Sequence, residues 1–337
     1  MIYEGYLYIL SKCGDNPSAD CLKSLWNTDV KFYFVGNDVK NTFKKLTPLL
    51  PQCGKLEPNL ISLSKCFSQI TPNLDIGLRI DGDVIVGNNL NVGKNGLSFQ
   101  IMKVDRYMGI SSMESGLIKE QVTVFSDLSG VYVFLLGLIS SNVITIGTEY
   151  YFLLFDTSEI PNCLVQPTLW FSIKDKIKEE LGKTLKSIKR ISDEIISLEL
   201  LLNSSVIGMM KNNGLEEVNL RLLKIVSEGK SIKRNTYKVY NDFPVQLISN
   251  RKIYDDINLV KSLESLVNFL IIPASNFLNG NDKGDGYHAY NALKYLYMFL
   301  ASDNFEFLNM AIREIHEANK ANDKVGYLNW ITKLTIT

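Results

Sequence analysis

Two aspartates in the first third of the chain have the type and spacing to do chemistry. Asp81 and Asp83 flank Gly82 within the stretch 74–86, LDIGLRIDGDVIV. Paired carboxylates at a strand end can hold a divalent metal on a diphosphate, as in nucleotide-sugar glycosyltransferases. The same residues also form an Asp-Gly turn between two β-rich arms, because such turns require positive φ angles. We expect a β-hairpin, and a metal-dependent nucleotide-sugar glycosyltransferase is the alternative function.

Imidazole and thiol groups are scarce. The two histidines, His288 and His316, lie beside no recognisable nucleophile, so hydrolase and nuclease mechanisms that need several imidazoles are not favoured. The five cysteines are irregularly spaced and form no C-x-x-C, which indicates neither a disulfide framework nor a zinc site. We therefore expect buried free thiols, no metal, no cofactor and no catalytic residue. The cysteines are Cys13, Cys21, Cys53, Cys66 and Cys163.

Charge is balanced over the whole chain but unevenly distributed along it. Residues 170–252 carry 16 Lys and Arg against 10 Asp and Glu. Residues 1–169 carry 13 against 16, and residues 253–337 carry 7 against 10. A basic middle between two mildly acidic ends could bind a polyanion. A solvated helix followed by an exposed hairpin would give the same pattern.

The first half of the basic region predicts one long helix, about residues 171–202. Apolar residues recur there at a spacing of three or four, which gives the helix one apolar face. Its other faces could meet phosphates or simply be solvated. The basic residues of this helix are Lys174, Lys176, Lys178, Lys183, Lys186, Lys189 and Arg190.

The second half predicts a hairpin, with strands at 218–227 and 231–240 closed by a turn at 228–230. Basic residues interleaved with aromatic residues on a β-ribbon suit a nucleic-acid backbone. Lysines also protect an ordinary exposed edge strand from aggregation, so both interpretations stay open. The residues expected to share one strand parity, and thus one side, are Lys230, Arg234 and Lys238.

The longest apolar stretch must form the core around these segments. Residues 128–148 contain no charge, and their length alone would allow a membrane span. A Ser-Ser-Asn break at 140–142 and the absence of flanking Lys or Arg clusters favour a folded core instead. We expect a buried helix at 131–139, followed by strands at 143–146 and 150–155. Other expected elements are strands at 30–35, 97–104 and 122–125 and helices at 41–50 and 61–70.

The last 85 residues predict four amphipathic helices joined by short loops, which points to a bundle. We expect the first to end at Pro273, and Asp303 with Glu306 to form a capping box. The predicted class is α+β, with an N-terminal mixed α/β domain, a β-hairpin insertion and a C-terminal helical bundle. The predicted divisions are 1–167 for the α/β domain, 168–252 for the basic long helix and hairpin, and 253–337 for a four-helix bundle.

The N-terminal residues lack a basic start and a small-residue cleavage site, so we expect a cytoplasmic protein.

Three stretches resemble the large subunit of the archaeal type I-A CRISPR interference (Cascade) complex. GVYVFLLGLISSNVITIGTEYYFLLFD is similar to that family's buried helix followed by a strand pair. VNLRLLKIVSEGKSIKRNTYKVYNDFPVQLI is similar to its hairpin segment, and AYNALKYLYMFLASDNFEFLNMAIREI is similar to its C-terminal helical pair. Together these stretches cover about a quarter of the chain.

The resemblance implies a non-enzymatic subunit of a crRNA-bound assembly in antiviral defence. Such subunits help to read the protospacer-adjacent motif in duplex DNA and to stabilise strand separation in the R-loop. The implied partners are backbone, crRNA-end-binding and small subunits, with cleavage by a separate helicase–nuclease, and no membrane. The family supplies no motif residues here, so the expected DNA contacts come from the charge pattern alone. They are Lys183, Lys186, Lys189, Arg190, Lys224, Lys230, Lys233, Arg234 and Lys238.

A third hypothesis is a purely structural interaction protein.

Overall fold

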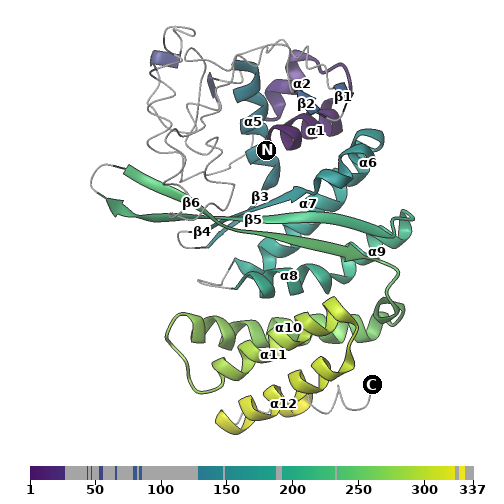
Figure 1. Cartoon of the computed structure of the whole chain (residues 1–337), viewed down its shortest axis with the longest axis vertical. Coiled ribbons are helices and arrows are strands. Elements are labelled where there is room, and N and C mark those ends of the chain that lie inside the picture. The colour runs from purple at the N-terminus through teal and green to yellow at the C-terminus, as the bar shows by residue number, and fades with distance from the viewer. Residues whose placement is uncertain are drawn as a thin grey trace. The chain divides into compact units, whose positions relative to one another are not determined.

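The fold is described from a computed structural model of the whole chain (Figure 1). The structure describes residues 1–26, 44, 47, 53–55, 65–66, 79–81, 83–85, 128–146, 149–186, 192–231, 234–322 and 326–330. These residues form helices and two antiparallel sheets, so the predicted α+β class is confirmed. The three predicted divisions stay a prediction. The strands expected at 30–35, 97–104 and 122–125, and most of the helices expected at 41–50 and 61–70, lie outside the described residues.

The chain forms two compact units that alternate along the sequence, and each is described by itself. Unit 1 comprises Met1–Asn142, Ile160–Phe171 and Leu223–Asp242. Unit 2 comprises Val143–Glu159, Ser172–Leu222 and Phe243–Thr337.

Helix α5 (Leu128–Ser141) is the core of unit 1, and every residue from 131 to 141 is buried. The predicted buried helix is therefore confirmed. Helix α1 (Ile2–Cys13) packs against it. The crossing is so close that a Cβ on Gly5 would lie 1.8 Å from the Val133 carbonyl oxygen. A Cβ on Gly137 would likewise lie 1.8 Å from the Met1 carbonyl oxygen, so both positions admit only glycine.

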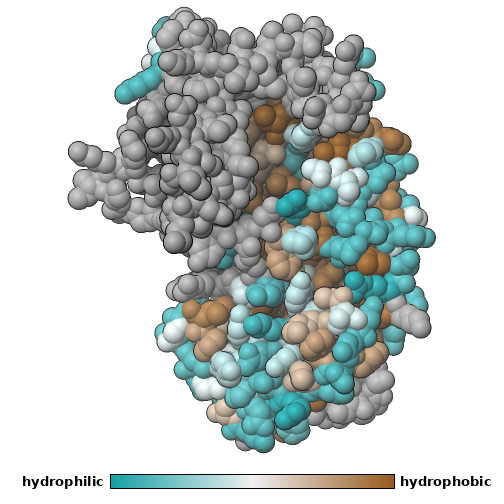
Figure 2. Space-filling model, viewed as in Figure 1, coloured by the Kyte–Doolittle hydropathy of each residue, from teal (hydrophilic) through white to brown (hydrophobic). Residues whose placement is uncertain are grey.

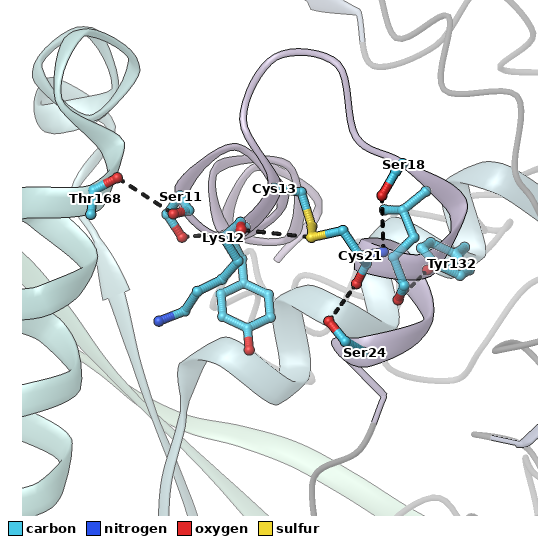
Figure 3. Close-up of a disulfide and its surroundings, with 10 residues drawn as sticks. Ser11, Lys12, Cys13, Ser18, Cys21, Ser24, Tyr132 and Thr168 are labelled. Carbon is cyan, nitrogen blue, oxygen red and sulfur yellow. Dashed lines mark hydrogen bonds between the residues drawn. A yellow bond between two sulfur atoms is a disulfide. The ribbon is translucent and has the colours of Figure 1, made fainter.

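Helix α2 (Ala19–Ser24) is held on α5 through Tyr132. The Tyr132 hydroxyl donates a hydrogen bond of 3.1 Å to the Leu22 carbonyl, and the Trp26 ring packs edge-on against Tyr132 at 5.1 Å. The Ser18 hydroxyl caps α2 by accepting from the Cys21 backbone N–H (Figure 3). Unit 1 also contains helix α6 (Ile160–Val165), which contacts α1.

A disulfide joins Cys13 at the end of α1 to Cys21 in α2 (Figure 3). Cys66 is disulfide-bonded as well, whereas Cys163 is a buried side chain. The prediction that the cysteines are free thiols is therefore wrong for Cys13, Cys21 and Cys66. The physical reason is the turn between α1 and α2, which brings the Cα atoms of Cys13 and Cys21 to 5.9 Å, within disulfide range. Irregular spacing along the sequence gives no sign of that approach.

The larger sheet has the strand order β3-β4-β5-β6. Strands β3 (Asn142–Ile146) and β4 (Glu149–Phe155) confirm the predicted strand pair. Strands β5 (Glu217–Ser231) and β6 (Arg234–Ile248) confirm the predicted hairpin but are longer than expected.

Strand β5 continues to Ser231 and β6 begins at Arg234, so the turn predicted at 228–230 is wrong, because these residues lie within β5. The ladder register at the base explains the difference, because the Ser249 N–H donates to the Glu216 carbonyl. Pairing that continues from this contact places the turn beyond the Glu-Gly-Lys signal. The smaller sheet consists of β1 (Arg79–Asp81) and β2 (Asp83–Ile85), which pair antiparallel as the predicted hairpin.

Unit 2 holds most of helix α7 (Pro167–Leu185), then α8 (Asp193–Leu201) and α9 (Ser204–Asn212). The single helix predicted at 171–202 is therefore wrong, because α7 ends at Leu185 and α8 begins after Ser192. Ser192 has extended backbone, with φ −86° and ψ 156°. Continuous apolar spacing cannot reveal this break, because both helices bury the same kind of face. Short 3₁₀ turns are η2 (Cys53–Lys55), η6 (Thr157–Glu159) and η7 (Lys252–Asp255).

Among the described residues of unit 2, three successive helices precede a helical turn at 326–330. Helix α10 (Ile257–Leu278) packs on α11 (Gly286–Ser302), and α11 packs on α12 (Phe305–Ala321). Pro273 lies inside α10, so the prediction that it ends the helix is wrong. Tyr327, in a helical turn at 326–330, donates 2.8 Å to the buried carboxylate of Asp285. Within the described residues, no helix combines the length and the apolar character that crossing a bilayer requires.

The junction of α11 and α12 differs from the predicted capping box. The N-cap of α12 is Asn304, whose side chain accepts from the Glu306 N–H at 3.0 Å. Asp303 is instead the C-cap of α11, with a φ of 54°. The Arg251 guanidinium donates to the Leu300 carbonyl and lies 3.9 Å from the Asp303 carboxylate. A cation at a helix C-terminus is favourable, because the exposed carbonyls there carry partial negative charge.

The close approach of α1 and α5 at Gly5 and Gly137 predicts how one added methyl group changes stability. Gly137→Ala should lower the free energy of unfolding by about 3 kcal/mol or more, because its Cβ has no room against α1. Gly182→Ala is the matched control, since nothing lies within 4 Å of a Cβ there. It should raise stability by about 0.5–1 kcal/mol through helix propensity. Urea unfolding measures both, and equal midpoints for the two variants would contradict the close crossing.

Burial of Tyr254 predicts a loss of stability at alkaline pH. Its hydroxyl donates 2.8 Å to the Leu201 carbonyl, and burial raises the pKa of Tyr254 to about 12 from a reference of 10.0. Because the folded state holds this proton more tightly, its contribution is complete below pH 10 and lost as pH rises towards 12. The loss should be about 2–3 kcal/mol in urea unfolding at successive pH values. Tyr254→Phe should reduce the alkaline loss of stability by about this amount, whereas Tyr287→Phe, at a half-exposed position, should retain it. A smaller loss remains in Tyr254→Phe, because burial also raises the pKa of Tyr132.

Candidate nucleic-acid interface

The predicted contacts on the basic helix are only partly within the described structure. Lys183 lies in the last turn of α7, and Lys186 follows the end of that helix with an exposed side chain. Lys189 and Arg190 lie outside the described residues. The break between α7 and α8 falls within this basic run, so the run does not follow one continuous helical face.

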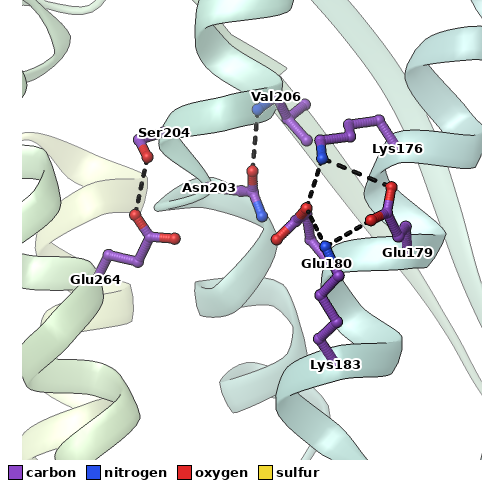
Figure 4. A network of polar contacts seen from close by, with 8 residues as sticks. All are labelled: Lys176, Glu179, Glu180, Lys183, Asn203, Ser204, Val206 and Glu264. Carbon is purple, nitrogen blue, oxygen red and sulfur yellow. Dashed lines mark hydrogen bonds and ion pairs between the residues drawn. The ribbon is translucent and has the colours of Figure 1, made fainter.

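Carboxylates on α7 itself neutralise part of its basic charge (Figure 4). Lys183 lies 2.5 Å from Glu179 and 3.2 Å from Glu180. Lys176 lies 2.6 Å from Glu180 and 3.6 Å from Glu179. The side-chain hydrogen bond to Glu179 raises the pKa of Lys183, and the same bond lowers the pKa of Glu179. These are i,i+3 and i,i+4 pairs, which favour a solvated face for this part of α7.

Two further lysines are buried. Lys174 on α7 is fully buried, and its Nζ lies 5.0 Å from the centre of the Phe155 ring on β4. Lys224 on β5 is 8% exposed, between the buried residues Leu223 and Ile225. Both faces of β5 are therefore covered at this point. Lys224, which was expected to contact DNA, is thus a poor candidate for a phosphate contact in this fold.

The outer part of the hairpin is a two-stranded ribbon. Strands β5 and β6 have 15 residues each, whereas β4, the neighbour of β5, has seven, so at least eight residues of β5 have no partner on β4. The Asp156 N–H, just after β4, donates to the Asn219 carbonyl near the start of β5, so the part of β5 towards Ser231 continues beyond β4. We call residues 223–242 the ribbon arm; they belong to unit 1 and carry five Lys and Arg against two Asp and Glu.

Basic residues gather around the tip of the ribbon arm. Lys230 lies on β5, whereas Arg234 and Lys238 lie on β6, so the single strand parity expected to place all three on one side does not apply to Lys230. The cause is the later turn, which leaves Lys230 on the first strand. Lys233 lies outside the described residues. All four positions fall within residues 230–238, around the point where β5 ends and β6 begins.

The base of the hairpin, in unit 2, is acidic instead. The Glu159 carboxylate accepts from both the backbone N–H and the side-chain amide of Asn219, at 3.0 and 2.9 Å. Glu217 accepts from Gln246 and Asn219, and these two hydrogen bonds lower the pKa of Glu217. Arg221 is paired with Asp156 at 3.7 Å. A polyanion would therefore be attracted to the tip and not to the base.

The groups considered for catalysis have ordinary structural surroundings where they are described. Asp81 and Asp83 are cross-strand neighbours in the β1–β2 ladder, as the hairpin interpretation expects. The His288 Nδ1 lies 2.7 Å from the Glu314 carboxylate, and His316 is exposed on α12. Among the described residues, no three His, Cys, Asp or Glu side chains are grouped to hold a metal ion.

Sequence reasoning missed two features that decide which lysine side chains are available to contact a polyanion. The pairing of Lys176 and Lys183 with Glu179 and Glu180 could have been found from the i,i+3 and i,i+4 spacing. The burial of Lys224 also had a local signal, because Leu222, Leu223, Ile225 and Val226 form an apolar run around it, which is typical of a strand covered on both faces.

Comparison with known proteins gives a remote relative. The chain is 26% identical over 264 residues to an uncharacterized protein of Archaeoglobus fulgidus. The matched region covers 73% of this chain and 65% of the relative, so the chain spans less than two thirds of that protein's length. No protein-family model matches the chain, and no solved structure matches it.

Replacing a buried lysine with alanine should lower the free energy of unfolding more than replacing an exposed one. Lys224→Ala should lower the free energy of unfolding by about 2–3 kcal/mol, because it removes a packed aliphatic stem and a buried polar group. Lys186→Ala, at an exposed position, should change it by less than about 0.5 kcal/mol. Urea unfolding of the two variants measures the difference. A neutral Lys224→Ala would mean that this side chain is free to reach solvent.

Proposed function

We propose that this chain is the non-catalytic large subunit of a crRNA-guided type I-A CRISPR interference complex. In this role it contributes to binding of target duplex DNA, reading of the protospacer-adjacent motif and stabilisation of the R-loop in antiviral defence. The observation that carries the proposal is the ribbon arm, a two-stranded extension past β4 with its positive charge around the tip.

The shape of the ribbon arm fits a duplex partner. The major groove of B-form DNA is wide enough to admit a two-stranded β-ribbon. Lys and Arg around the tip would neutralise phosphates and release counterions, which supplies affinity without sequence preference. Such contacts fix the position and orientation of the protein, and base readout would be added by groups that reach the groove.

The secondary structure of the three resembling stretches also supports the proposal. The first stretch contains α5, β3 and β4, a buried helix followed by a strand pair. The second contains the β5–β6 hairpin, and the third spans most of α11 and α12. The order and type of these elements match what the resemblance implies.

The neutral net charge of the chain indicates that it acts within an assembly. A dedicated DNA-binding protein is usually basic overall, and here a basic arm stands beside an acidic base. Backbone, crRNA-end-binding and small subunits would complete the groove around the DNA, and a separate helicase–nuclease would cut it. The proposed location is the cytoplasm, and the proposed role needs no cofactor.

A charge-removal experiment tests the role of the ribbon arm. The quadruple variant replaces Lys230, Lys233, Arg234 and Lys238 with alanine. Its assembled complex should bind duplex DNA roughly 10- to 100-fold more weakly, whatever the sequence. The slope of log affinity against log salt should fall by up to about 0.9 for each lost phosphate contact. Titration of labelled duplex at several salt concentrations measures both quantities.

The matched control removes the same charge from exposed positions on α10 and α12 and in the loop between α10 and α11, all in unit 2. Its substitutions are Lys261→Ala, Lys283→Ala, Arg313→Ala and Lys320→Ala. This control should leave binding within about twofold, since long-range charge effects are screened. Equal loss in both variants, or no loss in either, would remove the ribbon arm from the DNA interface. Manganese-dependent hydrolysis of a nucleotide sugar, abolished in Asp83→Ala, would replace the whole proposal with the glycosyltransferase alternative.

A further inference from the structure

The position of the segment from Gly14 to Trp26 within unit 1 depends on one disulfide bond. Along the chain it follows α1 through an exposed turn, whose first residue, Gly14, has a φ of 72°. The disulfide between Cys13 and Cys21 spans this turn and ties α2 back to the end of α1 (Figure 3).

Within the described residues, the buried side chains of this segment lie on one side of α2. Leu22, Leu25 and Trp26 are buried, and the Leu22 carbonyl accepts the hydrogen bond from Tyr132. The opposite side is exposed at Asp20, Lys23 and Ser24. A helix of six residues is far too short to be stable without such anchors.

The disulfide is also the anchor that solvent reaches most easily. Cys13 and Cys21 are both partly exposed, whereas Tyr132 is fully buried. A small reductant can therefore approach the sulfur atoms while the α5 contacts are still in place. The cross-link closes a short loop and restricts the open conformations of this segment in the oxidised chain. Reduction removes that restriction and so favours opening.

We propose that the Cys13–Cys21 disulfide is a redox-sensitive clasp that fixes α2 over Tyr132. A dithiol reductant would transfer two electrons and two protons: the Cys13–Cys21 bond breaks to give two thiols, and the dithiol becomes a disulfide. In the reduced protein α2 then opens locally, and Leu22 and Trp26 leave Tyr132 on α5. A low-molecular-weight disulfide, itself reduced to two thiols as it takes up the two electrons and two protons, restores the Cys13–Cys21 bond and the buried segment. This inference is independent of the proposed function.

Amide hydrogen exchange on the full chain tests the clasp. Compared with the oxidised wild type, the double variant Cys13→Ser, Cys21→Ser should exchange at least about tenfold faster at residues 19–25. Residues 131–139 of α5 should stay within about twofold, because their burial does not depend on this bond. The double variant is needed because a dithiol also reduces the disulfide of Cys66. Dithiol treatment of the wild type should accelerate exchange at residues 19–25 in the same way.

Tyr132→Phe serves as a second variant, because it removes the hydrogen bond to Leu22 and keeps the cross-link. Its residues 19–25 should exchange more slowly than those of the double serine variant. Unchanged exchange at 19–25 in the double serine variant would overturn the proposal. So would equal acceleration at 19–25 and 131–139, since the disulfide would then support the whole of unit 1.

Discussion

Cross-strand pairing between β5 and β6 is the constraint on which the proposed interface depends. At the base of the hairpin Val218, Leu220 and Leu222 are buried on one strand, and Val245 and Leu247 on the other. Shifting the register by one residue would turn these apolar side chains to the opposite face, so burial at the base fixes the pairing. The ladder then continues without β4 beside it, and the register set at the base decides where the turn falls and which strand each basic residue occupies.

The distribution of available charge follows from how the fold uses its lysines. Lys174 and Lys224 are buried, and Lys176 and Lys183 are paired with carboxylates one turn away on α7. The base of the hairpin adds Glu159 and Glu217 to its surface. The net positive charge of residues 170–252 is therefore larger than the positive charge that α7 leaves available to a polyanion. The tip of the ribbon arm is the better candidate for a phosphate-binding surface.

Unit 1 and unit 2 are stabilised by different kinds of contact. The α1–α5 crossing in unit 1 relies on two glycines, because carbonyl oxygens occupy the space that a Cβ would need. In unit 2 the helices are fixed by polar groups at their ends. Arg251 closes the C-terminus of α11, and Tyr254 donates to the last turn of α8. Loss of one such group leaves a buried partner without its hydrogen bond, which costs more than the bond contributes.

The sequence by itself determined the elements that local periodicity encodes. The uncharged run predicted α5 followed by β3 and β4, and alternating residues around 218–240 predicted a hairpin, because burial of one face imposes a period on the chain. Amphipathic spacing likewise predicted helices in the last third. The break between α7 and α8, the extension of β5 to Ser231 and the continuation of α10 through Pro273 were decided only by the tertiary structure. So was the Cys13–Cys21 bond. Each of these features depends on which segment, distant in the sequence, packs against a residue. The residues next to it in the sequence do not indicate that contact.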